Sequence, residues 1–258
     1  MRTDNTKNAF TLVELLVVIS IIALLLGILL PTLGAARGVA QRTICAFNIR
    51  NCSAAFSLYA HDYNGFLPLG NIWGREDKPE GWLDINYDTA VTIHTKYGIE
   101  EISAMCTSWY FEKDKYFQEP PSANDGNFKL GGMRIGYIYY GRRFDQAGDT
   151  YSPMLPDGSV YKSPRKLENC TKNSVTSQTL FTCSHWDSTS AGGAWGAKFP
   201  HTGSGRGVYY QAGVKEFNPR PKGLVTGYTD CSAEWVKWKN LKWFQQAGSI
   251  RIYYSPRM

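Results

Sequence analysis

Residues 10–30 read FTLVELLVVISIIALLLGILL and are almost wholly apolar. At about 1.5 Å per residue a helix of this length would reach roughly 31 Å, which matches the hydrocarbon core of a bilayer. We therefore expect a single membrane-spanning helix at residues 10–30. Arg2 and Lys7 precede it. By the positive-inside rule they hold the N-terminus in the cytoplasm, which places the rest of the chain on the outer face of the cytoplasmic (inner) membrane, in the periplasm or outside the cell.

One residue interrupts the apolar run. Glu14 lies four positions after Phe10, and an unpaired carboxylate in hydrocarbon costs about 2.5–3.5 kcal/mol on insertion scales, so such a charge usually has a function. The surrounding stretch NAFTLVELLVVI, residues 8–19, resembles the N-terminal signature of type IV prepilins and type II secretion pseudopilins. The resemblance continues through Pro31, where those families commonly carry a proline, and through residues 45–68.

This resemblance implies a specific processing chemistry. Residues 1–9 would be a cytoplasmic leader that a prepilin peptidase removes between Ala9 and Phe10, after which the new Phe10 amine is methylated. Glu14 of an incoming subunit would then neutralise the Phe10 ammonium of its neighbour, because opposite charges attract strongly in a medium of low dielectric constant. Ala9 departs from those families, which generally carry glycine before the cleaved bond. An uncut chain would remain a signal-anchored membrane protein.

A rival interpretation is an ordinary signal peptide. Arg2 and Lys7 would form its charged region, and the small residues 34–36 would be a signal peptidase site, which would release a soluble protein that begins at Arg37. Two features oppose it: Glu14 lies near the start of the apolar run, and the run exceeds the 7–15 residues usual for a signal peptide. The prepilin interpretation is therefore favoured.

Beyond the span, apolar residues recur at three- and four-residue steps as far as Tyr63. This pattern predicts that the helix continues over residues 31–64 with a kink at Pro31, and that residues 65–258 form a β-rich globular domain. The resemblance implies the same fold class, α+β and pilin-like, in which a long N-terminal helix packs on a C-terminal antiparallel sheet with long loops.

The domain contains several runs of β-branched and aromatic residues. They predict strands at residues 133–140, 179–183, 224–228, 233–238 and 249–254, with a short helix at residues 90–97. The third and fourth runs would form a hairpin whose turn begins at Asp230. The stretch 184–207 is dense in Gly, Ser and Thr and predicts a long exposed loop.

A second resemblance is weaker. One large group of pilin-like proteins ends with a histidine, a strand, an Asp-Gly turn and a Val-Glu-Trp-like strand. Pro200-His201 and the stretch DCSAEW at residues 230–235 are similar, with Cys231 at the position of the glycine.

Six cysteines, an even number, suit disulfide bonds in a domain outside the cytoplasm, and no Cys-x-x-Cys pattern indicates zinc. Cys45 and Cys52 would lie roughly 10.5 Å apart along one helix, too far for a mutual disulfide. Each would pair with one of the remaining cysteines or stay reduced. Among 15 possible connectivities we predict a Cys170–Cys183 bridge.

The sequence favours no catalytic or metal site. The histidines, His61, His94, His185 and His201, are isolated and offer no paired ligand spacing, so we predict no metal and no cofactor. Cys183 and His185, two apart on a strand, would point the same way without a hydrogen bond, which opposes a nucleophile and base pair. The net charge of +6 is scattered, so it indicates no nucleic-acid partner. We expect a protein that is not an enzyme.

Three functions follow from these observations. The first is a structural subunit, a pilin or pseudopilin of a type IV pilus or type II secretion-like filament, whose partners are the prepilin peptidase, other such subunits and the inner membrane. The second is a signal-anchored surface module that binds, for example, glycans by stacking on exposed aromatic residues. The third, an exported hydrolase, has the least support. Aromatic clusters such as residues 137–140 and 235–243 favour packing over ligand binding.

Overall fold

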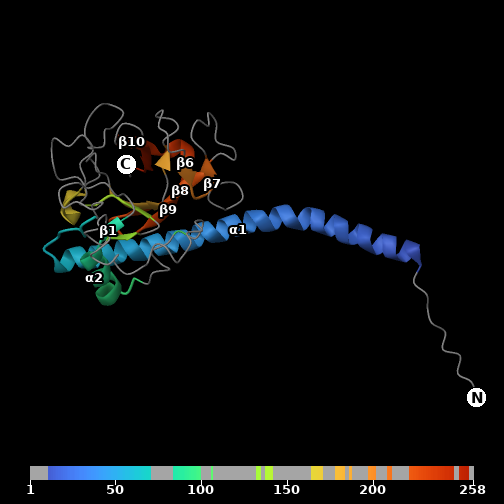
Figure 1. The fold of residues 1–258 in the computed structure, drawn as a ribbon, viewed down its shortest axis with the longest axis horizontal. Helices are drawn as coiled ribbons and strands as arrows, with labels where there is room; N and C mark the ends of the chain where they lie inside the picture. Colours follow the sequence, from blue (N-terminus) through green and yellow to red (C-terminus); the bar gives the residue numbers. More distant parts are fainter. Residues whose placement is uncertain are drawn as a thin grey trace, which may run out of the picture.

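A single long helix leads into a globular domain in the computed structural model of the chain (Figure 1). The structure describes residues 11–70, 84–99, 106, 132–134, 137–141, 164–170, 178–183, 186–187, 197–201, 208–210, 221–246 and 250–255. Helix α1 (Leu12–Asp62) has 51 residues and is therefore about 77 Å long. Its end lies close to Asn64, where the sequence predicted it.

Both ends of α1 are fixed by local chemistry. Thr11 is the N-cap and forms a capping box with Glu14, which satisfies two backbone N–H groups that a helix start leaves without an intrahelical partner. At the other end Asn64 and Gly65 adopt positive φ angles of 53° and 81°, and the Gly65 N–H donates to the Ala60 carbonyl at 2.7 Å. This left-handed turn is a common helix stop.

The helix runs through Pro31 without interruption and bows gently along its length (Figure 1). Proline provides no N–H for the helical ladder. Beside it, the Thr32 hydroxyl donates to the carbonyls of Ile28 and Leu29 at 3.3 and 2.9 Å. Such a hydroxyl bond to the preceding turn often accompanies a bend. A localised kink at Pro31 stays a prediction.

The second half of α1 buries one stripe against the domain. Its members recur every three or four residues, as an amphipathic helix requires. They are Cys45, Asn48, Ile49, Cys52, Ser53, Ala55, Phe56, Tyr59 and Ala60. Ile44 and Phe47 belong to the same apolar pattern in the sequence, but they are 49% and 62% exposed and lie off the stripe.

A four-stranded antiparallel sheet receives this stripe. Its strand order is β3 (Tyr137–Tyr139), β4 (Thr179–Cys183), β8 (Gly223–Tyr228) and β9 (Ala233–Lys237). Helix α1 contacts β8, β9 and β4, and the Phe56 ring packs edge-on against the rings of Tyr139 and Phe181 at centroid distances of 4.9 and 4.8 Å. The helix and this sheet therefore build the core together.

A second sheet lies farther from α1 and has five strands. Its order is β10 (Lys242–Gln246), β11 (Ile250–Tyr254), β5 (Trp186–Asp187), β6 (Ala197–Phe199) and β7 (Val208–Tyr210). The Tyr140 hydroxyl joins the two sheets, since it donates to the Tyr253 carbonyl at 2.7 Å and lies 3.0 Å from the Thr182 hydroxyl.

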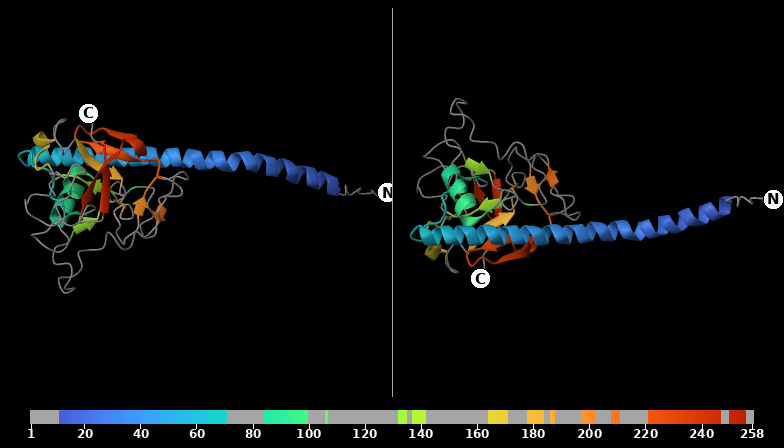
Figure 2. Two further views of the ribbon diagram at one scale, coloured as in Figure 1. Left: turned by 90° about the horizontal axis from the view of Figure 1, so that it is seen from above. Right: turned by 90° about the horizontal axis from the view of Figure 1, so that it is seen from below.

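Helix α2 (Tyr87–Tyr97) and a short two-stranded ribbon lie near the C-terminal end of α1 (Figure 2). Strands β1 (Asp84–Asn86) and β2 (Gly132–Arg134) form the ribbon, and α2 lies beside α1. Two 3-10 turns complete the described elements: η3 (Leu167–Asn169) and η4 (Trp238–Asn240).

The predicted α+β, pilin-like arrangement of a long N-terminal helix on a C-terminal antiparallel sheet is confirmed. Four predicted strands correspond to β4, β8, β9 and β11, and the run at 133–140 is divided between β2 and β3. The predicted hairpin is present as β8 and β9, and in its turn the Asp230 carboxylate accepts from the Ser232 N–H at 2.9 Å. Cys231 adopts φ 63°, a conformation that usually favours glycine.

The predicted exposed loop at residues 184–207 is wrong for the part of it that the structure describes, residues 186–187 and 197–201. Strands β5 and β6 lie in it, and Phe199 and His201 are only 0% and 2% exposed. The Phe199 ring packs against the rings of Trp238 and Tyr253, at 4.9 and 6.2 Å. These contacts come from distant segments, so the local excess of Gly and Ser concealed them.

Candidate functional site

The first half of α1 is apolar on all sides and projects away from the domain (Figure 1). Leu12, Leu24 and Leu30, for example, are 85%, 68% and 64% exposed. By length and composition this helix is able to cross a membrane. A water-exposed apolar surface of this size is costly, and a helix that is apolar all round suits lipid or the packed interior of an assembly.

Glu14 is the one charged residue of the span, and the structure pairs it with Thr11. The carboxylate oxygen Oε2 accepts from both the backbone N–H and the hydroxyl of Thr11, each at 2.8 Å. The Glu14 N–H in turn donates to the Thr11 hydroxyl at 3.3 Å. The carboxylate thus has local donors before any neighbour supplies one.

Ala9 and Phe10 lie outside the described residues. Cleavage between them and methylation of Phe10 therefore stay predictions.

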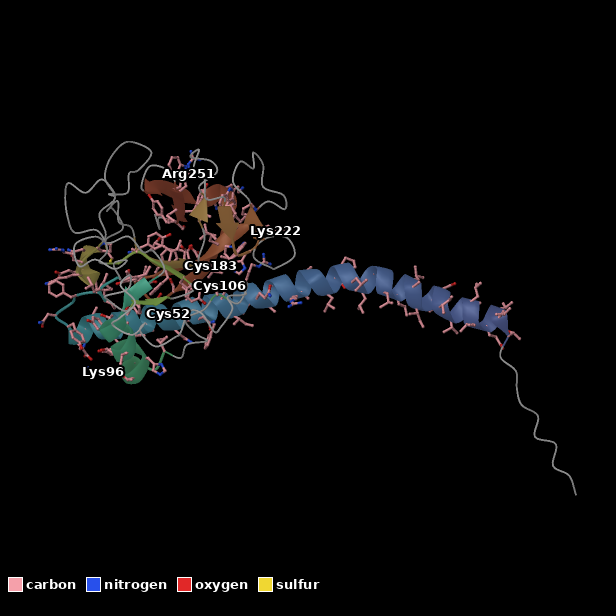
Figure 3. All side chains as sticks on the ribbon, viewed as in Figure 1. Cys52, Lys96, Cys106, Cys183, Lys222 and Arg251 are labelled. Atoms are coloured by element: carbon pink, nitrogen blue, oxygen red, sulfur yellow. The ribbon has the colours of Figure 1, made fainter. Side chains whose placement is uncertain are left out.

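A buried cluster of three thiols and one imidazole lies where α1 meets the sheets. Cys45 comes from the buried stripe of α1, Cys183 ends β4, and His201 follows β6. Cys106 comes from the chain between α2 and β2. Figure 3 shows Cys106 and Cys183 together beside α1. We call these four residues the Cys3His cluster.

The donor atoms of the Cys3His cluster all lie within 4.8 Å of one another. The sulfur of Cys45 is 2.9 Å from that of Cys183 and 3.6 Å from that of Cys106. The His201 Nε2 lies 3.2 Å from the sulfur of Cys183 and 3.9 Å from that of Cys106. The four residues are between 0% and 2% exposed, so the cluster is closed to solvent.

Burial is the largest single influence on the pKa values of the three thiols in this cluster. It raises the pKa of Cys45 and of Cys183 well above the ordinary value, because a buried thiolate loses its hydration. Burial acts in the same direction on Cys106, but hydrogen bonds from Cys183 and Cys45, together with His201, hold the pKa of Cys106 well below the ordinary value.

The imidazole is held in place from two sides. The His201 ring packs edge-on against the Trp235 ring, with centroids 5.4 Å apart, and the His201 carbonyl accepts from the Lys222 N–H at 3.3 Å. His201 and the Asp230 to Trp235 hairpin, which the second resemblance linked in sequence, are thus neighbours in space.

Sequence reasoning missed the Cys3His cluster. It found no metal-ligand spacing, because Cys45 and Cys106 are 61 residues apart and Cys45 and Cys183 are 138 apart. One residue of the cluster, Cys183, was predicted to form a disulfide with Cys170. Both residues carry thiols rather than a disulfide, and Cys170 donates instead to the Lys166 carbonyl at 3.7 Å. The tertiary fold turns Cys183 toward Cys45 and His201, which spacing along the chain did not indicate.

The other cysteines lie outside the cluster. Burial raises the pKa of Cys52 and of Cys170 to about 12. Cys231 is partly exposed, and its thiol donates to the Ser57 hydroxyl at 3.6 Å. His185 lies outside the described residues, so its suggested pairing with Cys183 is not addressed, and the imidazole beside Cys183 is that of His201.

Comparison with known proteins bears on the N-terminal segment. Residues 4–30 match the family model of the prokaryotic N-terminal methylation motif. No curated protein and no solved structure matches the chain. The match includes Ala9, Phe10, Glu14 and most of the exposed apolar half of α1. Residues 4–30 of this chain are a prepilin-type N-terminal cleavage and methylation segment.

Proposed function

We propose that this protein is a structural subunit, a pilin or pseudopilin, of a type IV pilus or type II secretion-like filament. A prepilin peptidase would cut between Ala9 and Phe10, and the mature subunit would assemble through α1. The domain that begins after α1 would face the periplasm or the exterior. The observation that carries the proposal is the division of α1 into an exposed apolar half, most of which lies within the methylation motif at residues 4–30, and a second half built into the domain core.

The exposed apolar half of α1 would occupy two apolar environments, one after the other. In the bilayer it is surrounded by lipid, and in a filament it would be surrounded by the same half of neighbouring subunits. The second environment needs no refolding of the domain, because the buried stripe of α1 that packs in the domain core lies C-terminal to the exposed half. The domain would therefore keep its fold when the helix moves from the bilayer into the filament.

Glu14 would supply the specificity of this packing. Inside the apolar core of a filament its carboxylate would meet the Phe10 ammonium of a neighbour, and the Thr11 donors that it already has would reduce the cost of burying it. A neutral side chain of the same shape would lose that attraction.

Five described aromatic side chains of the predicted clusters support packing over a binding surface. Tyr137, Tyr139 and Tyr140 are fully buried, and the rings of Trp235 and Trp238 pack on His201 and on Phe199. The rival signal peptidase site at residues 34–36 lies inside the continuous helix α1, so a cut there would divide a formed element.

The experiment compares wild-type protein with Glu14→Gln in cells that express the peptidase and the assembly machinery. We expect mature wild-type protein to begin with N-methylated Phe10, by mass spectrometry of its N-terminus, and to enter sheared filaments. Glu14→Gln should still enter the membrane but should be lost from the filament fraction. Val13→Ala, a neighbouring apolar change, is the matched control and should assemble. Equal assembly of Glu14→Gln, or natural protein that starts at Arg37, would contradict the proposal.

A further inference from the structure

We propose that the Cys3His cluster, formed by Cys45, Cys106, Cys183 and His201, is a structural zinc site. The proposal stands apart from filament assembly, since it concerns only the folded domain. It rests on the type of the four donors, their spacing and their burial.

The donor set is one that zinc prefers. Three thiolates and one imidazole form a recognised structural zinc sphere, and a site with four protein ligands leaves no open position for a substrate or water. Complete burial of the four residues fits a closed site of this kind. The cluster is therefore suited to holding the fold together and not to catalysis.

The distances agree with one shared metal ion. With Zn–S near 2.3 Å and Zn–N near 2.0–2.1 Å, tetrahedral geometry places sulfurs about 3.8 Å apart and sulfur and nitrogen about 3.6 Å apart. The observed nitrogen to sulfur separations of 3.2 and 3.9 Å lie on either side of the second value, and the observed sulfur separations of 2.9 and 3.6 Å are shorter than the first. All four donor atoms lie within 4.8 Å of one another, so one ion would reach them after small movements of the side chains.

A disulfide explains the cluster less well. A disulfide bond of about 2.05 Å joins only two sulfurs. It would leave the third thiol and the imidazole buried together without an ion that both of them bind. Zinc uses all four groups. In that reaction three S–H bonds release their protons to solvent, three Zn–S bonds and one Zn–N bond form, and no oxidant or reductant is needed.

The site would fasten together parts of the chain that are far apart in sequence. Cys45 fixes α1, Cys183 fixes the end of β4, His201 fixes the segment after β6, and Cys106 fixes the connection between α2 and β2. Metal binding to residues that are separated in the unfolded chain contributes directly to folding free energy. Zinc would thus attach the membrane-anchoring helix firmly to the domain it carries.

The test measures metal content in the full-length protein, purified in detergent without added chelator. We expect about one zinc per chain by mass spectrometry of metals, and a loss of at least fivefold in Cys106→Ser and in His201→Asn. Cys52→Ser and Cys170→Ser are the matched controls, because each removes a buried thiol outside the cluster, and both should retain the zinc. Unchanged zinc in both cluster variants would overturn the proposal.

A second measurement covers the case in which the cluster variants do not fold. Wild-type protein stripped of metal and given Co²⁺ should develop the visible d–d bands and the near-ultraviolet charge-transfer bands of tetrahedral thiolate coordination. Alkylation under denaturing conditions without reductant should modify all six cysteines. Absent bands, or a disulfide that joins two of the three cluster cysteines, would overturn the zinc assignment.

Discussion

Gly227 of β8 lies directly against Ile49 of α1. A Cβ added at Gly227 would be 2.2 Å from the Cγ2 of Ile49 and 3.0 Å from the Ser53 hydroxyl. No real pair of carbon atoms approaches that closely without rearrangement, so the absence of a side chain at Gly227 sets how near the helix lies to the sheet. The contact lies in the interface between α1 and the four-stranded sheet.

Gly227→Ala should therefore destabilise the domain by about 1–3 kcal/mol, the usual cost of overpacking a core. Denaturant unfolding of the full-length protein in micelles measures it. In an Ile49→Ala background the clashing methyl is gone, so the same glycine substitution should cost clearly less. Equal costs in the two backgrounds would show that the contact with Ile49 does not set the helix distance.

The bridge between the two sheets gives a second prediction. Tyr140→Phe removes the hydroxyl that bonds the Tyr253 carbonyl and the Thr182 hydroxyl, and loss of a buried hydrogen-bonded group should cost about 1–3 kcal/mol in the same unfolding assay. Tyr63→Phe is the control, because Tyr63 is 42% exposed, and it should change stability by less than about 0.5 kcal/mol.

The stability that the C-terminal end of α1 gains from its contact with α2 should depend on pH. Asp62 has its pKa lowered to about 2, first by the hydrogen bond from Lys96 at 2.9 Å and then by the Tyr97 hydroxyl at 2.7 Å. Because the folded pKa lies below the unfolded one, this contact between α1 and α2 stabilises the protein above about pH 4 and is lost as the pH falls toward 2.

Carboxyl ¹³C shifts of Asp62 over this range measure its pKa. Lys96→Met should raise the pKa of Asp62, whereas Lys239→Met, on the distant turn η4, should leave it unchanged. A titration of Asp62 that does not respond to Lys96→Met would refute the assigned cause.

Thiol reactivity should separate the cysteines outside the Cys3His cluster. A thiol with a pKa of about 12, as burial gives Cys52, is thiolate in about one molecule in 10,000 at pH 8. Iodoacetamide at pH 8 should therefore label the partly exposed Cys231 of the folded protein well before Cys52, as read by peptide mass spectrometry. Both should react alike after denaturation. Labelling of Cys52 as fast as Cys231 in the folded protein would contradict its burial.

The capping box gives a local prediction. Thr11→Val removes the hydroxyl that bonds Glu14 and should weaken the first turn of α1 by about 1 kcal/mol, which corresponds to roughly fivefold faster hydrogen exchange at the Glu14 amide. Thr11→Ser keeps the hydroxyl and should exchange at nearly the wild-type rate. NMR of the full-length protein in micelles reads both.

The sequence by itself determined the features whose cause is local. An apolar run long enough to cross a bilayer and a three- and four-residue apolar period are properties of neighbouring residues, and they predicted the length of α1 and the apolar character of its first half. The same holds for β4, β8, β9 and β11, where β-branched and aromatic residues are concentrated, and for the Asp230 turn.

Only the tertiary structure decided what depends on distant partners. Phe199, in a strand between residues 184 and 207, is held by contacts to other segments. The missing side chain of Gly227 matters only because Ile49 faces it. The Cys3His cluster is the strongest case, because its four residues share no spacing rule. They meet only in the folded domain, where α1 packs on β4 and where Cys106 and His201 come from two further segments.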